Sequence, residues 1–218
     1  MLKSTKLKNT LLVGTTTILV SCGGQNEIKM GSYAYDAEFL KKHGIEYTEL
    51  VSADGNSKVM VIPAWQGRVM TSSASGDEGD SFGWINYRFI DKGEISTQFN
   101  PVGGEERFWL GPEGGPFSLY FKGGQEQVYD NWVVPAVLDT EPFKVEAQNE
   151  SSIRFVKDTR LTNASGTTFD INIDRIVSLM DADKVAADFN IQLTNDMKIV
   201  AYKSENKITN MGENAWTK

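Results

Sequence analysis

Short apolar runs separated by turn residues restrict this fold more than any other feature of the sequence. In the clearest run, Phe169–Leu179, apolar residues at 169, 171 and 173 alternate with polar residues at 170, 172 and 174. Such alternation is typical of a strand with one buried face. Other runs follow from Glu46 onward, with turn residues at intervals of roughly ten positions. The sequence therefore predicts an all-β fold, an antiparallel β-sandwich or barrel with almost no helix.

The remaining elements are assigned from the same alternation of apolar runs and turn residues. Lys58–Ile62 is expected to be a strand, and Trp84–Ile90 a short strand or turn. One short N-terminal helix is expected over Tyr35–His43, with Asp36 capping its first turn. The other expected strands are Gln66–Ser72, Phe143–Gln148, Ile153–Lys157, Val185–Leu193 and Ile199–Ser204.

The stretch Asn100–Phe121 is rich in glycine and proline, and it carries charged and aromatic side chains between them. Glycine permits positive φ and proline forbids a helix interior, so the stretch is expected to form strand, loop and strand. Glu105, Arg107, Trp109 and Glu113 lie within it. A stiffened loop with such side chains is a common way to build a binding site.

The first 22 residues have the features of a targeting segment. Three lysines precede Leu11–Val20, an apolar run shorter than the ~20 residues that span a bilayer. The run ends in Leu-Val-Ser before Cys22, which resembles the lipobox of bacterial lipoproteins. We therefore expect a signal peptide at 1–21, a lipidated tether at 22–34 and one domain at 35–218. By the same resemblance, glycine after Cys22 favours the outer membrane.

Composition excludes several classes of site and partner. A single cysteine allows no internal disulfide, and a single histidine, His43, argues against a histidine zinc site, so no metal or other cofactor is expected. Removing three lysines with the signal peptide leaves a net charge of 19 − 29 = −10. This charge argues against nucleic acid, which requires clusters of basic residues. Neutral sugars remain compatible, and the oligomeric state is not determined.

Three segments resemble a known family. Trp65–Asn86, Gly103–Phe121 and Thr159–Trp216 are similar to uncharacterised bacterial lipoproteins whose fold resembles galactose mutarotase, the aldose 1-epimerase supersandwich. The resemblance implies a sandwich of this type and a carbohydrate ligand. Aldose epimerases use histidine as the acid and a C-terminal glutamate as the base, whereas His43 lies outside the matching segments. Family members continue with further strands, so we expect the sandwich to be partial at its C-terminus.

A sugar site needs aromatic faces for stacking and charged or amide groups for the hydroxyls. By the resemblance, Arg107 lies where domains of this kind often carry a sugar-contacting arginine after a glycine-rich turn. An inward Arg175 would need a carboxylate partner, for which Glu105 or Glu113 is expected. An active enzyme would need a general acid and base, for which Glu113 and Glu205 are the candidates. The expected substrate-binding residues are Arg68, Glu105, Arg107, Trp109, Arg175 and Asn206.

Three functions follow from these residues. The first is a membrane-anchored lipoprotein that binds carbohydrate, with binding expected rather than catalysis. The second is an active aldose epimerase that works through carboxylates. The third is a structural or degenerate lipoprotein fragment without a ligand.

The lipid anchor gives a direct test. Replacing Cys22 by Ser should remove the acyl mass from the N-terminal peptide and move the protein out of the membrane fraction, because the acyl chains supply the attachment. Mass spectrometry and membrane fractionation measure the two effects. A C22S protein that stays with the membrane in equal amount would contradict the anchor.

Overall fold

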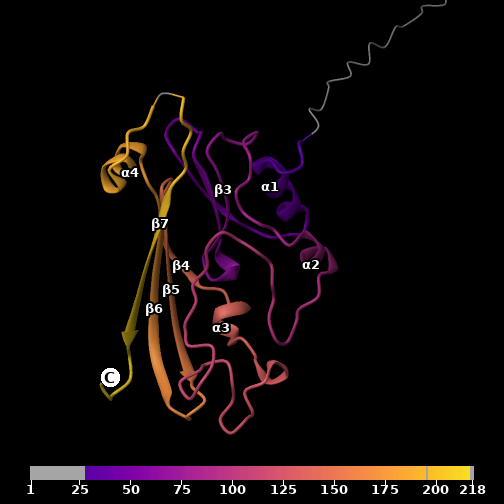
Figure 1. The fold of residues 1–218 in the computed structure, drawn as a ribbon, viewed down its shortest axis with the longest axis vertical. Helices are drawn as coiled ribbons and strands as arrows, with labels where there is room; N and C mark the ends of the chain where they lie inside the picture. The colour runs from indigo at the N-terminus through magenta and orange to yellow at the C-terminus, as the bar shows by residue number, and fades with distance from the viewer. Residues whose placement is uncertain (1–27, 195, 217–218) are drawn as a thin grey trace, which may run out of the picture.

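The computed structural model describes residues 28–194 and 196–216, so the expected signal peptide and Cys22 lie outside the described residues. The described strands form two antiparallel sheets, β1-β2-β3 and β4-β5-β6-β7 (Figure 1). Their bounds are β1 Thr48–Val51, β2 Lys58–Ile62, β3 Arg68–Ser73, β4 Lys144–Gln148, β5 Ser152–Thr162, β6 Thr168–Leu179 and β7 Tyr202–Asn210.

Helices are few and short. They are α1 Tyr33–Lys42, α2 Tyr87–Lys92, α3 Ala136–Asp139 and α4 Ala182–Phe189, with 3-10 turns at η1 Pro63–Trp65 and η2 Tyr129–Asn131. Within the described part of the chain, no helix has the length and apolar character needed to cross a membrane.

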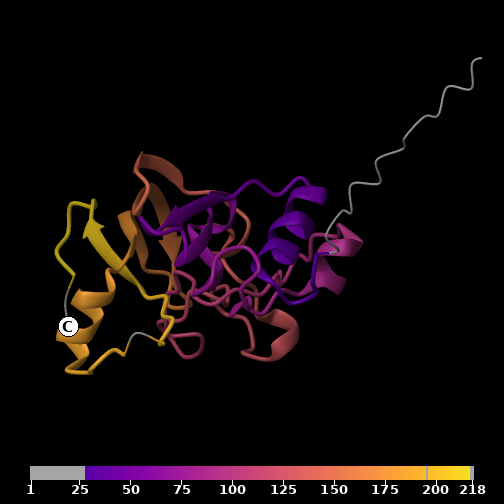
Figure 2. The same ribbon diagram turned by 90° about the horizontal axis from the view of Figure 1, so that it is seen from above.

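The two sheets face each other across a shared core, an arrangement consistent with a β-sandwich. Helices α1 and α2 lie on the side of the three-stranded sheet that faces away from β4–β7 (Figures 1 and 2). Apolar side chains of both sheets meet in this core, and they include Leu50, Val59, Val61, Val69, Ile153, Phe155, Ile171, Ile173 and Val177.

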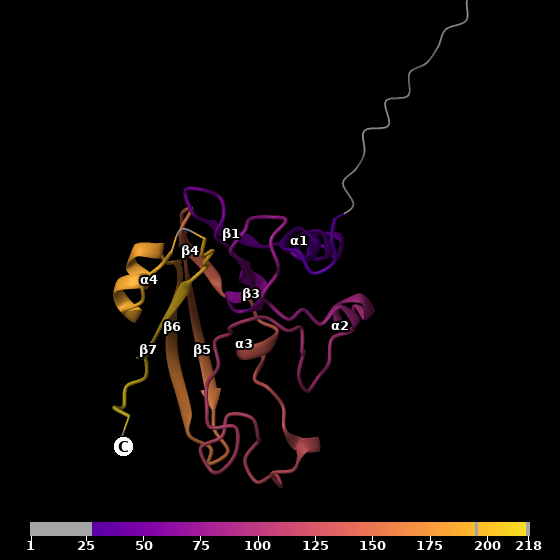
Figure 3. The ribbon, with the colours of Figure 1, turned by 45° about the horizontal axis from the view of Figure 1, so that its top comes forward.

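Strand β2 explains why its sequence is a continuous apolar run. Val59 and Val61 belong to the core between the sheets, whereas Met60 and Ile62 pack in a second core with α1 and α2. Successive side chains of a strand point to opposite faces, so a strand covered on both sides needs apolar residues at every position. The three-stranded sheet is therefore the middle layer, and the long segment from β3 to β4 wraps around it (Figure 3).

Several expected strands are confirmed. Lys58–Ile62 coincides with β2, and the cleanest alternating run forms most of β6. The hairpin expected from Phe143–Gln148 and Ile153–Lys157 is the β4–β5 pair. Strand β7 begins at Tyr202 and extends beyond the expected Ile199–Ser204.

Two expected elements are helical instead. Val185–Leu193 was expected as a strand, but Ala182–Phe189 forms α4, in which three alanines and a Lys184–Asp188 pair one turn apart favour a helix. Trp84–Ile90 was expected as a strand or turn, but α2 covers its second half, with Asn86 as its N-cap.

The stretch Asn100–Phe121 contains no regular strand, contrary to expectation, because its backbone makes only isolated bridges such as Val69 to Glu106. The N-cap of α1 is also different from the expected one. The Ser32 hydroxyl accepts the Tyr35 N–H at 3.2 Å. Asp36 is buried and accepts hydrogen bonds from Ser81 and Tyr87, and burial raises its pKa.

Gly67 precedes β3 with φ of +64°, and a Cβ there would lie 2.5 Å from the Phe155 ring. Gly44 has a similar φ of +69° but open space around it. Gly44→Ala should therefore cost about 1 kcal/mol for the backbone alone. Gly67→Ala should cost about 1–3 kcal/mol more, because the core around Phe155 must move. Urea unfolding, followed by tryptophan fluorescence, measures the free energy of unfolding of both variants. Equal losses of stability in the two variants would contradict the close packing at Gly67.

Candidate functional site

The segment 103–107 is held tightly against the middle sheet. Gly103 and Gly104 have φ of +98° and +113°, and a Cβ on Gly103 would lie 2.1 Å from the Trp84 carbonyl oxygen. The Glu105 N–H donates to the Val69 carbonyl at 2.9 Å. Side chains 105, 106 and 107 therefore leave a fixed backbone, and each enters a different environment.

Arg68 holds this segment in place through a hydrogen bond to its backbone. Its Nη1 donates to the Gly103 carbonyl at 2.6 Å, and the residue is only 3% exposed. Burial, together with the nearby Arg107 charge, lowers the pKa of Arg68 to about 9. Arg68 was expected to contact sugar, and in the structure its buried guanidinium bonds to the backbone of this segment.

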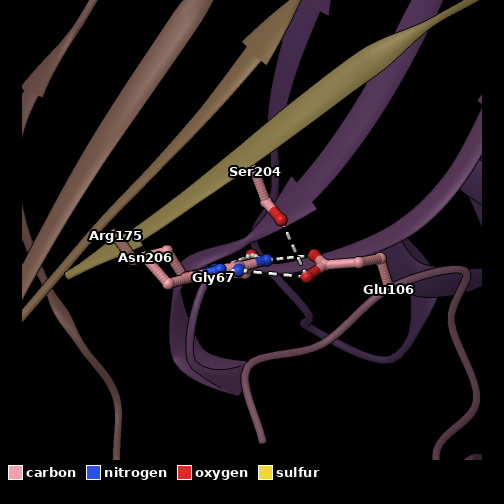
Figure 4. A network of polar contacts seen from close by, with 5 residues as sticks. All are labelled: Gly67, Glu106, Arg175, Ser204 and Asn206. Carbon is pink, nitrogen blue, oxygen red and sulfur yellow. Dashed lines mark hydrogen bonds and ion pairs between the residues drawn. The ribbon is translucent and has the colours of Figure 1, made fainter. Parts of the chain in front are cut away.

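Arg175 forms a buried network with Glu106, Gly67, Ser204 and Asn206 (Figure 4). Its Nη1 lies 3.1 Å from Glu106 Oε1 and 2.9 Å from Asn206 Oδ1, and Nη2 contacts Glu106 Oε2. Nε and Nη2 donate to the Gly67 carbonyl at 3.2 and 3.1 Å. Ser204 Oγ donates to Glu106 at 3.1 Å.

The expectation that Arg175 pairs with Glu105 or Glu113 is therefore wrong, because the carboxylate partner is Glu106. The side chain of Arg175 is fully buried, and all three of its nitrogens have acceptors. A guanidinium this well satisfied ties β6, β7 and the turn before β3 together. We assign Arg175 and Asn206 to this structural link.

Glu105 points into a cavity that we call the Glu105 hollow. Ser72 Oγ donates to both Glu105 oxygens, at 2.9 and 3.1 Å. Burial raises the pKa of the Tyr202 hydroxyl, and the nearby Glu105 charge raises it further. The hollow has a volume of about 550 Å³ and is lined by Ser72, Ala74, Phe82, Glu105, Met180, Phe189, Lys198, Ile199, Val200, Ala201 and Tyr202.

The rim of the hollow carries two exposed aromatic rings. Phe82 is 58% exposed and Phe189 is 68% exposed. Neither phenylalanine was expected at the site, nor were Ser72 and Tyr202. Phe189 was not predicted because its segment was assigned to a strand. Ser72 and Tyr202 were not predicted because they are far apart in the sequence and meet only in the fold.

Arg107 and Trp109 lie in an aromatic cluster made of Phe99, Trp109, Tyr120, Tyr129 and Trp132. The Arg107 guanidinium lies 3.9 Å from the Trp109 ring centroid. Burial lowers the pKa of Arg107. The indole N–H of Trp109 donates to Glu113 Oε1 at 2.7 Å. The side chains of Trp109 and Glu113 are therefore hydrogen-bonded to each other.

The two carboxylates expected to act as a catalytic pair have separate partners. Glu113 accepts from Trp109, and Glu205 pairs with Lys203 at 2.9 Å. Glu205 alternates along β7 with Ser204 and therefore points to the opposite face of the sheet. The structure does not bring Glu113 and Glu205 into one site.

The only histidine has no free ring nitrogen. His43 Nδ1 lies 2.7 Å from the Phe39 carbonyl, and Nε2 lies 2.8 Å from Asp91 Oδ1. Both nitrogens face acceptors, so the imidazole is not placed to take a proton from a substrate. Among the described residues, no group of three His, Cys, Asp or Glu side chains is arranged to hold a metal ion.

A comparison with protein families gives one match. A family of unknown function, DUF6786, matches residues 31–218. The chain belongs to this family. No curated protein and no solved structure matches the chain. For this DUF6786 member the functional argument therefore depends on the site itself.

The Arg175 network predicts a contrast between buried and exposed ion pairs. Glu106→Gln should cost about 3–5 kcal/mol, because it leaves a buried guanidinium without its counter-charge. The exposed pair Arg160–Asp170 is the control, and Asp170→Asn should cost less than about 1 kcal/mol. Urea unfolding measures both, and adding Arg175→Met to E106Q should restore part of the loss. Equal costs for the two single substitutions would contradict the structural role of the network.

Proposed function

We propose that this chain is a lipid-anchored carbohydrate-binding protein of the bacterial cell envelope, and that it holds a neutral sugar in the Glu105 hollow. One observation carries the proposal: a carboxylate fixed by Ser72 lies in a cavity whose rim has two exposed phenylalanine rings. Aromatic rings and a fixed acceptor in one cavity are the two elements that sugar recognition requires.

Each element has a separate chemical role. Phe82 and Phe189 offer apolar faces to the C–H groups of a pyranose ring, and rings of this size contribute large contact areas. Glu105 accepts hydrogen bonds from sugar hydroxyls, and bonds to a charged acceptor are about twice as strong as neutral ones. A volume of about 550 Å³ falls within the range of small-molecule sites.

Charge favours a neutral ligand over an anionic one. The chain without its signal peptide has a net charge of −10, from 19 basic and 29 acidic residues. Lys198 is the single basic residue in the lining of the hollow. An anionic saccharide would be repelled at long range by the whole protein.

The anchor and the family likeness complete the proposal. Acylation at Cys22 would hold the domain at the outer membrane, where it would meet glycans. The two facing antiparallel sheets support a galactose-mutarotase-like sandwich. Aldose epimerase activity remains an alternative, but Glu113 and Glu205 have separate partners and offer no assembled acid and base.

Binding is tested with Glu105→Gln, which keeps the shape and removes the charge. We expect E105Q to weaken sugar binding about 10- to 100-fold, the usual effect of losing a hydrogen bond to a charged group. Isothermal titration of the full chain with neutral monosaccharides and disaccharides, galactose and glucose among them, measures the affinity. Phe189→Ala should also weaken binding, because it removes one stacking face.

Glu205→Gln is the matched control, since Glu205 lies on β7 but points to the opposite face. The E205Q variant should bind sugar with the same affinity as the unaltered protein. Polarimetry should show no faster mutarotation than buffer alone. If no sugar binds at millimolar concentration, or if E105Q and E205Q behave alike, the hollow is not a sugar site.

A further inference from the structure

Strand β7 forms an open edge of the four-stranded sheet, and we call it the β7 edge (Figures 1 and 3). It pairs with β6 along its whole length, Tyr202–Asn210. Among the residues that the structure describes, the backbone of β7 makes no hydrogen bond to other backbone groups outside that pairing. Alternate N–H and C=O groups of β7 therefore point outward without a backbone partner.

The two edges of this sheet differ in how well they could accept another strand. The opposite edge, β4, has five residues and a register shift between Val145 and Ala147. A short strand with such an irregularity is a poor template for further pairing. Strand β7 has nine residues, contains no proline and pairs with β6 without a register shift. The β7 edge is therefore the edge that can take a further strand.

Charges of alternating sign cross the outer face of the sheet and end at the β7 edge. Arg154 on β5 contacts Asp174 on β6 at 2.7 Å, and Lys207 on β7 lies directly opposite Asp174. The Arg154 hydrogen bond lowers the pKa of Asp174, and the Lys207 charge lowers it further. The row therefore runs positive, negative, positive. A negative group on the next strand would continue it beyond Lys207.

A second copy of β7 supplies that group. When two β7 strands pair antiparallel about Asn206, both overlap along their whole length, and Lys207 lies opposite Glu205 of the partner subunit. Glu205 and Lys207 are both exposed, and they are two residues apart, so they share one face of the strand. The neighbouring two-fold registers, centred on Glu205 or on Lys207, would instead set like charges opposite each other, which is destabilising.

We propose that the β7 edge binds a second copy of this chain, so that two four-stranded sheets join into one continuous sheet across a two-fold axis at Asn206. Backbone hydrogen bonds between the two β7 strands supply the affinity, and the Glu205–Lys207 pairs set the register. The β4 edge is short and irregular, so the pairing closes at the dimer. The interface does not depend on the proposed sugar site, because Glu205 and Lys207 lie on the face of β7 that points away from the Glu105 hollow.

Charge reversal tests this interface. Sedimentation equilibrium of the full chain, in a non-ionic detergent that shields the expected acyl chains, should give the mass of a dimer. Glu205→Lys and Lys207→Glu each set like charges opposite one another, so each variant alone should dimerise at least about tenfold more weakly. Mixed in equal amounts, the two variants should form a heterodimer, because each reversed charge then faces an opposite charge. Association in the mixture also shows that both variants are folded.

Glu146→Lys is the matched control, because Glu146 is an exposed acid on the β4 edge and contacts a lysine two residues away, as Glu205 does on β7. This substitution should leave dimerisation unchanged. A chain that stays monomeric up to about 1 mM would leave the β7 edge to a strand of another protein and would overturn the proposal. A dimer that E205K does not weaken, an equal loss in E146K, or a mixture of E205K and K207E that does not associate would also overturn it.

Discussion

The fold depends on the burial of one charge, that of the Arg175 guanidinium. Arg175 stands on the inward face of β6 among isoleucine and valine neighbours, where an unpaired cation would be untenable. Its partners come from three distant parts of the chain: Gly67 before β3, Glu106 in the glycine-rich segment, and Asn206 on β7. Satisfying this one side chain therefore fixes how the two sheets and the irregular segment meet.

The site is a consequence of that arrangement. Once Glu106 is bound to Arg175, the neighbouring Glu105 is turned toward Ser72 and Tyr202, and the next residue, Arg107, toward the aromatic cluster. Three consecutive charged residues thereby enter three environments: Glu105 the hollow, Glu106 the Arg175 network and Arg107 the face of the Trp109 ring. The short peptide 103–107 thus connects the stability of the fold to its proposed binding function.

Local pattern was sufficient to predict β2, most of β6 and the β4–β5 hairpin, because each is specified by its own alternation and turn residues. It was insufficient where distant contacts decide. The Val185–Leu193 segment has apolar residues that suit a strand, but its alanines and the Lys184–Asp188 pair favour α4. Glu105 was expected to bind substrate. The other residues of the Glu105 hollow come from distant parts of the sequence and lie together only in the folded protein: Ser72, Phe82, Phe189 and Tyr202. The partner of Arg175 was missed for the same reason.

The close approach of Gly103 to Trp84 decides which residues this loop tolerates. Any side chain at that position would overlap the Trp84 carbonyl oxygen, and one at the next position would meet Arg68. Both glycines also have positive φ, so a substitution there would strain the backbone as well. The backbone course that brings Glu105 to Ser72 therefore requires glycine at two consecutive positions, whatever side chain follows them.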